Sequence, residues 1–101
     1  MATQVLDDPG RRRFEIMING QLAGFTTYRN EAGSVALDHT QIDSRWQGRG
    51  LASRLIGEIL DKLRARGATV VPYCPFVRDF IVHHPEYADL VPPAHRSLIE
   101  S

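Results

Sequence analysis

The stretch that follows Gly50 carries the clearest periodic signal in the chain. Apolar residues there come largely as adjacent pairs that recur with the helical repeat, and charged residues fill the positions between them. The apolar positions are Leu51, Ala52, Leu55, Ile56, Ile59, Leu60 and Leu63. Gly67 stands where a glycine commonly ends a helix. The spacing therefore predicts a long amphipathic helix that starts after Gly50, ends near Gly67 and packs on a core by one face.

The residues before this helix have the pattern of an antiparallel meander. Over residues 13–18, Phe14, Ile16 and Ile18 alternate with Glu15 and Met17, which predicts a half-buried strand, and residues 21–28 return as a second strand. Between them lies Asn19-Gly20, and both residues tolerate the positive φ that a type I′ hairpin turn requires. A third strand is expected over residues 34–40. The residues expected to share one face of it are Val35, Leu37 and His39.

A short β-branched run at residues 69–73 predicts a strand after the helix. A strand–helix–strand unit favours a parallel pair with a right-handed crossover. The expected fold class is mixed α/β (α+β), an antiparallel meander plus one parallel strand, with the long helix over one face. Pro75 suits the first position of a second helix over about residues 76–83. The residues expected to point inward from this helix are Phe76, Val77 and Phe80.

At 101 residues the chain is expected to form one domain over residues 1–101, ordered from about residue 11 to residue 92.

Two glycines, Gly48 and Gly50, stand where the predicted long helix begins. The N–H groups in the first turn of a helix have no intrahelical acceptor, and the helix dipole places partial positive charge there. Without a Cβ at these glycines a phosphate can approach the N–H groups closely. Arg45 and Arg49 would add charge, so a phosphate-bearing ligand is one interpretation. The other is an ordinary tight turn, since the usual nucleotide fingerprints are absent.

The run Gln47-Gly48-Arg49-Gly50-Leu51-Ala52 resembles the Gln/Arg-x-x-Gly-x-Gly/Ala motif of the GNAT superfamily of N-acyltransferases. Three further segments, His39–Ile42, Pro72–Val77 and His84–Tyr87, make the chain similar to very short GNAT-like N-acetyltransferases of about its own length. The resemblance covers most of the chain, from about Arg13 to Leu90. It implies a minimal GNAT fold in which the two central strands splay apart and the donor lies in the gap.

The same resemblance implies an enzyme, an N-acetyltransferase that uses acetyl-CoA as acyl donor and an amine of a small molecule or a protein as acceptor. It places the pyrophosphate at the glycine motif and the pantetheine arm along the strand before it. The implied coenzyme A-binding residues are Gln41, Ile42, Gln47, Gly48, Arg49, Gly50, Leu51 and Ala52. The alternative is a module that binds coenzyme A, acyl-CoA or a protein partner without turnover.

His39 and Cys74 are the candidate catalytic residues. Transfer to an amine is helped by a base, and an imidazole can accept a proton near neutral pH. The alternative for His39 is a strand-end histidine bonded to backbone. Cys74 could protonate the departing thiolate or attack the thioester, and the alternative is a small buried apolar residue. The tyrosine that often acts as general acid in GNAT enzymes is missing from residues 76–82, which leaves these roles open.

Composition limits the partners that the chain can have. Lys and Arg number 12, Asp and Glu also number 12, and the formal net charge is zero, so no overall field gathers nucleic acid or an anionic membrane. A single cysteine excludes an internal disulfide and permits a reducing compartment, and a cytoplasmic location is expected. The adjacent His83 and His84 point about 100° apart on a helix, which disfavours a shared metal, so no metal is expected. The chain is expected to be a monomer or a homodimer.

Overall fold

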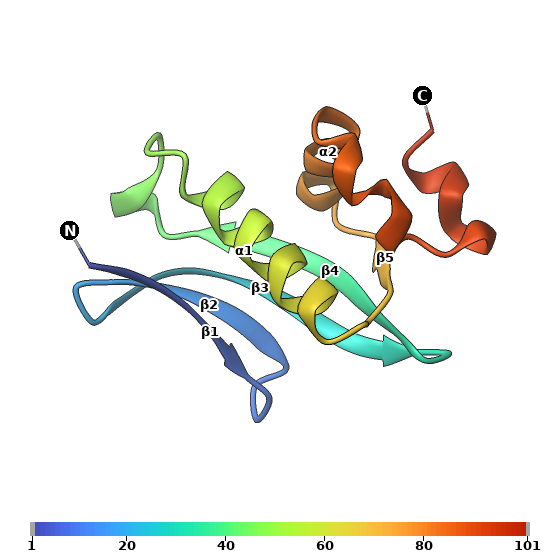
Figure 1. Ribbon diagram of the computed structural model, residues 1–101. Coiled ribbons are helices and arrows are strands. Elements are labelled where there is room, and N and C mark those ends of the chain that lie inside the picture. Colours follow the sequence, from blue (N-terminus) through green and yellow to red (C-terminus); the bar gives the residue numbers. More distant parts are fainter. Residues whose placement is uncertain (1, 101) are drawn as a thin grey trace.

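The computed structural model describes residues 2–100, which form a five-stranded mixed sheet with helices packed on one of its faces (Figure 1). The strands are β1 (Thr3–Asp8), β2 (Arg13–Ile18), β3 (Gln21–Glu31), β4 (Ser34–Ile42) and β5 (Val70–Pro72). The helices are α1 (Leu51–Ala65) and α2 (Pro75–His83). Three 3-10 segments complete the described part, η1 (Ser44–Trp46), η2 (Pro85–Leu90) and η3 (Pro93–Leu98).

The strands follow one another across the sheet in the order β1-β2-β3-β4-β5. The first four are antiparallel neighbours, and β5 pairs in parallel with β4 from Val35↔Val70 to Leu37↔Pro72. The expected meander with one parallel strand is confirmed. The turn between β2 and β3 has positive φ at Asn19 (49°) and Gly20 (79°), as a type I′ turn requires.

Two bulges decide which side chains face the helices. The first makes Ala23 an extra residue of β3, so Ala23 is fully buried while Leu22 is 36% exposed. The second makes Asp38 an extra residue of β4, between the pairs Tyr28↔Leu37 and Thr27↔His39.

Beyond a bulge, the alternation of faces along a strand is shifted by one residue. Leu37 therefore faces the core before the bulge, and Thr40 faces it afterwards. His39 is exposed, so the expectation that it shares a face with Leu37 is wrong.

Helix α1 lies across the sheet, and its apolar stripe is buried as the spacing predicts. Its buried residues are Leu51, Leu55, Ile56, Ile59, Leu60 and Leu63, with Ala52 half-buried at the edge. Gly67 ends the helix with a φ of 69°. The Gly67 and Ala68 N–H groups each donate to carbonyls of the last turn at 3.0 Å, which is the Schellman arrangement.

Helix α2 packs beside α1, but with a different inward face from the one expected. Val77 and Ile81 are buried, Phe80 is half-buried, and Phe76 is 56% exposed. Val77 and Ile81 are four residues apart and so share one side of the helix, whereas Phe76 lies about 100° around from Val77. Phe76 therefore stands beside the core instead of inside it.

Regular structure extends beyond the expected ordered range of residues 11–92 at both ends. Strand β1 pairs with β2 along its whole length, from Thr3↔Ile18 to Asp8↔Arg13, and buries Val5. Segment η3 follows Pro92, and Ile99 packs against the core. The Cα radius of gyration is 13.0 Å, as expected for about 100 residues. Within the described residues, no helix has the length and apolar character needed to span a bilayer.

Candidate functional site

Strand β4 is longer than β5, so the last part of β4 has a free edge where β5 has ended. Pairing between the two strands stops at Leu37↔Pro72, and the Cys74 N–H then donates to the Leu37 carbonyl at 2.9 Å before the chain turns into α2. Strand β4 continues to Ile42 without a strand partner on this edge among the described residues. The two central strands therefore part, as the resemblance implied.

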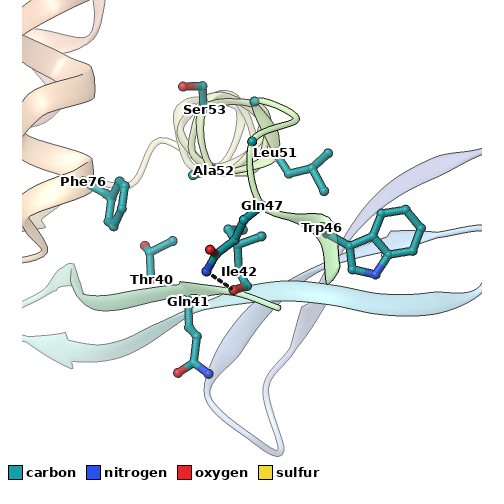
Figure 2. Close-up of a pocket in the computed structure, with 11 residues that line it drawn as sticks. Thr40, Gln41, Ile42, Trp46, Gln47, Leu51, Ala52, Ser53 and Phe76 are labelled. Atoms are coloured by element: carbon teal, nitrogen blue, oxygen red, sulfur yellow. Dashed lines mark hydrogen bonds between the residues drawn. The ribbon is translucent and has the colours of Figure 1, made fainter. Parts of the chain in front are cut away.

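The backbone of β4 presents polar groups to this open edge. The Asp43 N–H donates to the Ala23 carbonyl at 2.8 Å, so the peptide groups of Asp43 point toward β3. Successive residues of a strand direct their peptide groups to opposite sides, so those of Ile42 and Thr40 point toward the opening. The Ile42 carbonyl accepts a hydrogen bond there from the Gln47 side-chain amide at 3.3 Å (Figure 2).

The loop between β4 and α1 exposes a row of amide groups. Gly48 and Gly50 have φ values of 79° and 72°, which residues with a side chain rarely adopt. Gly50 is the N-cap of α1. A Cβ built at either glycine meets no atom within 4 Å, so the space in front of them is open. Within residues 2–100, the N–H groups of residues 48–53 donate to no protein acceptor. This is the arrangement that binds an anion at a helix start.

A cavity of about 480 Å³ joins the open strand edge to the glycine loop, a size typical of small-molecule sites (Figure 2). Seven of the eight implied coenzyme A-binding residues line it: Gln41, Ile42, Gln47, Gly48, Gly50, Leu51 and Ala52. The Gln41 side chain points away from the cavity, so this residue contributes backbone (Figure 2). Arg49 does not line the cavity. Its guanidinium lies 5.1 Å from the centre of the Trp46 ring instead.

Four lining residues lie outside the implied coenzyme A-binding set: Thr40, Trp46, Ser53 and Phe76. Thr40 was missed because the bulge at Asp38 changes its face. Phe76 was missed because its apolar character placed it in the predicted core. Ser53 carries a signal that could have been used, since a serine in the first turn of a helix lies close to any ligand held there.

The charged side chains near the loop are largely engaged with one another. The Asp43 carboxylate accepts hydrogen bonds from the Arg45 backbone N–H at 2.9 Å and from the Arg45 guanidinium at 3.2 Å. These two bonds, the backbone one first, lower the pKa of Asp43 below its ordinary value. The unpaired amides of the loop are therefore its main candidate groups for binding an anion.

The structure does not bring the two candidate catalytic residues together. Cys74 is 1% exposed, and its thiol donates to the Thr40 hydroxyl oxygen at 3.3 Å, beneath the cavity. His39 projects from the opposite face of β4, with its ring centre 6.4 Å from that of Phe25. Cys74 is hydrogen-bonded to Thr40, and His39 precedes Thr40 in the chain.

A second cavity of about 250 Å³ continues from the first between α1 and α2, and shares Ser53 and Phe76 with it. It contains Asp79, His83 and His84. The His84 ring stacks on Phe80 with centres 4.2 Å apart, so this histidine has a packing partner. In the part of the chain that the structure describes, no three His, Cys, Asp or Glu side chains gather in a metal-binding group.

Comparisons with known proteins identify the family and the fold. The family described as GCN5-related N-acetyl-transferase matches residues 13–90. A GCN5-like candidate N-acetyltransferase from Staphylococcus aureus, solved by NMR, superposes with a TM-score of 0.65 at 18% identity, over 88% of this chain and 87% of that one.

A ribosomal-protein-alanine N-acetyltransferase from Brucella melitensis biovar Abortus 2308 superposes with a TM-score of 0.55 at 22% identity, over 79% of this chain and 61% of that one. These structures share the fold. A comparison with curated proteins gives no significant match. The family model matches most of this chain, and the solved structures share its fold. The chain therefore belongs to the GCN5-related N-acetyltransferase (GNAT) family.

Proposed function

We propose that the protein transfers the acetyl group of acetyl-CoA to a primary amine of a small molecule or a protein. One observation carries this proposal: the unpaired amides of Gly48, Gly50 and the first turn of α1 line the same cavity as the open edge of β4. A diphosphate needs several N–H donors at close range, and a helix start opened by two glycines supplies them. Coenzyme A is the donor whose chemistry fits both halves of the cavity.

The open edge suits the pantetheine arm of this donor. Pantetheine carries two amide groups in an otherwise flexible chain, and amides pair with exposed strand edges as an added strand does. The peptide groups of Thr40 and Ile42 point toward the opening and can accept or donate such bonds. The Gln47 side-chain amide, now bonded to the Ile42 carbonyl, would have to move when the arm uses that carbonyl.

The reaction itself joins the amine nitrogen to the acyl carbon and breaks the carbon–sulfur bond. The electron pair of that bond leaves on sulfur, and the proton lost by the amine balances the one gained by the thiolate. None of the residues that line the main cavity carries a group that titrates near neutral pH. His39 therefore remains the candidate base. It is exposed on the face of β4 opposite the cavity, so it can serve an amine that reaches the thioester from that face.

Replacement of His39 tests this role through the dependence of rate on pH. If His39 accepts the amine proton, His39→Gln should lower kcat/KM at pH 7 by roughly 10²-fold. The loss should shrink as the pH approaches the pKa of the acceptor amine, because the amine then deprotonates in solution. An equal loss at all pH values, or no loss at pH 7, would rule out the base.

Donor binding is tested by titration of the protein with acetyl-CoA while backbone amide resonances are followed by NMR. The largest shifts are expected over residues 41–53, and Gly50→Glu should abolish them by placing a carboxylate in front of the anion site. The absence of any resonance shift at millimolar acetyl-CoA would refute the proposal.

Thiol release with a panel of amines then separates an enzyme from a binding module, because a module would bind the donor and release no thiol.

The module has one observation in its favour. His39 and Cys74 both lie outside the cavity lining, so no candidate catalytic group touches the donor cavity directly. Binding without turnover for every amine tested would support that alternative.

A further inference from the structure

Three buried side chains form a hydrogen-bonded cluster beneath the main cavity. Thr26, Thr40 and Cys74 come from β3, β4 and the residue before α2, and they are 0%, 6% and 1% exposed. The two threonine hydroxyl oxygens lie 2.8 Å apart, and the Cys74 sulfur lies 3.3 Å from the Thr40 hydroxyl oxygen. Of the three residues, only Thr40 also lines the cavity.

The direction of these hydrogen bonds follows from burial. A hydroxyl has one proton to donate and two lone pairs that accept, and buried donors in folded proteins are paired. The Thr26 hydroxyl is fully buried, and Thr40 is its hydrogen-bonding partner within residues 2–100. Thr26 therefore donates to Thr40. The buried Cys74 thiol also donates to Thr40.

Two accepted hydrogen bonds occupy both lone pairs of the Thr40 oxygen. Its own proton then has no acceptor in the cluster and is left for a partner elsewhere. The cavity is the side on which Thr40 is open, where its side chain stands between Phe76 and Gln47 (Figure 2). The cluster thus orients one hydroxyl proton into the cavity that is proposed to hold the donor.

We propose that Thr40 is a catalytic residue, which donates a hydrogen bond to the acyl thioester, and that Thr26 and Cys74 are its positioning residues. This inference rests on the proposed function. A donor that is held in place before the reaction stabilises the negative charge that develops as the carbonyl is attacked and the carbon–sulfur bond breaks. Thr40 keeps its proton throughout, so the cluster neither gains nor loses charge.

The most direct test is the carbonyl signal of the bound donor. A hydrogen bond from Thr40 should shift the ¹³C resonance of [1-¹³C]acetyl-CoA downfield and lower its carbonyl stretching frequency on binding. Both changes should persist in Thr40→Ser, which keeps a hydroxyl, and disappear in Thr40→Val. An unchanged carbonyl signal in Thr40→Val would overturn the inference, whether or not an acceptor amine has been found.

Kinetics provide the second test once an acceptor is known. Thr40→Val should lower kcat by about 10²-fold with little change in the KM for acetyl-CoA, and Thr40→Ser should restore most of the rate. Thr69→Val is the matched control, because it removes a hydroxyl that pairs with the Ser34 hydroxyl at 2.6 Å near the opposite end of β4. Its kcat should equal that of the wild type.

The positioning residues are tested by a double-mutant cycle. Thr26→Val frees a lone pair of Thr40 and lets its proton turn away, so kcat should fall, and Thr26→Val combined with Thr40→Val should lose no more than Thr40→Val alone. Additive losses would show that Thr26 acts independently. Cys74→Ala removes one donor to Thr40 and should lower kcat, and Cys74→Ser, which keeps a donor, should recover part of the lost rate. Loss of all turnover in Cys74→Ser, with an acetyl group found on Cys74 of the wild type, would overturn the positioning role.

The outcomes separate the two proposals. A wild-type protein that does not bind acetyl-CoA refutes the proposed function and this inference with it. A protein that binds and turns over the donor, but keeps its carbonyl signal and kcat in Thr40→Val, refutes only the role of Thr40. Thermal unfolding of each variant confirms that the folded protein is being compared.

Discussion

The Tyr28 side chain links three strands on the β1 side of the sheet. Its hydroxyl donates to the Asp7 carboxylate of β1 at 2.6 Å, and its ring centre lies 5.0 Å from that of Phe14 on β2. Asp7 also accepts a hydrogen bond from Arg66, at the end of α1, at 3.1 Å. Burial, followed by the bond to Asp7, raises the pKa of Tyr28 to about 12.

A raised tyrosine pKa means that the folded state holds the phenol proton more tightly than the unfolded state does. This stabilisation is complete below the unfolded pKa of about 10, and it is lost as the pH rises toward the folded pKa of about 12. We therefore expect Tyr28→Phe to be less stable than the wild type at pH 7. The difference should narrow between about pH 10 and pH 12. Urea unfolding at a series of pH values measures it, and a constant difference would contradict the role of the phenol proton.

At the scale of the element, α1 has a left-handed glycine at each end. Gly50 precedes the first turn with a φ of 72°, and Gly67 follows the last with a φ of 69°. A Cβ at either position meets no atom within 4 Å, so the conformational cost of a side chain should be similar at the two ends. The two glycines differ in their surroundings, because only Gly50 lines the cavity.

This symmetry provides a matched pair of substitutions. Gly50→Ala and Gly67→Ala should each lower the free energy of unfolding by about 1 kcal/mol, because alanine is strained at positive φ. Only Gly50→Ala should also weaken acetyl-CoA binding, by about tenfold, because its Cβ enters the space in front of the amide row. Calorimetric titration and urea unfolding of both variants check the prediction. Equal affinities in the two variants would mean that the donor does not approach Gly50.

At the scale of the whole molecule, segment η3 contacts side chains at the end of β3 and just after β5. The His95 ring packs edge-on to Tyr73 with centres 6.3 Å apart, and its Nε2 lies 3.8 Å from the Glu31 carboxylate. The same carboxylate accepts a hydrogen bond from the Tyr73 hydroxyl at 2.6 Å, which is the main reason that the pKa of Glu31 is lowered. Segment η3 therefore belongs to the folded domain.

Removal of residues 93–101 tests this conclusion. The shortened chain should lose about 1–3 kcal/mol of unfolding free energy, because the contacts of His95 and the packing of Ile99 are lost. Its affinity for acetyl-CoA should change little, since none of the described residues 93–100 lines the cavity. Removal of residues 100–101 alone is the control and should leave stability unchanged. Equal stability of both shortened chains would place η3 outside the cooperative unit.

Much of this architecture could be predicted from the order of residues. The stripe from Leu51 to Leu63, the Asn19-Gly20 turn and the glycines before α1 each express a local rule, in which a few neighbouring residues set the conformation. The family motif lies in one such segment, and it named seven of the residues that line the cavity. The parallel pairing of β5 with β4 also followed, because the intervening helix leaves few other connections.

The orientations of Thr40, His39 and Phe76 were decided by the tertiary structure alone. Alternation along β4 placed His39 inward, and the bulge at Asp38 reversed it, because a bulge depends on the register with β3 and not on the residues of β4 themselves. Phe76 is apolar, yet it lies on the rim of the cavity because Val77 and Ile81 occupy the side of α2 that meets α1 and the sheet. Local sequence therefore determined which elements form and where the glycine loop leaves its amides unpaired. Strand register and helix packing, which join residues distant in the chain, decided which side chains face the cavity.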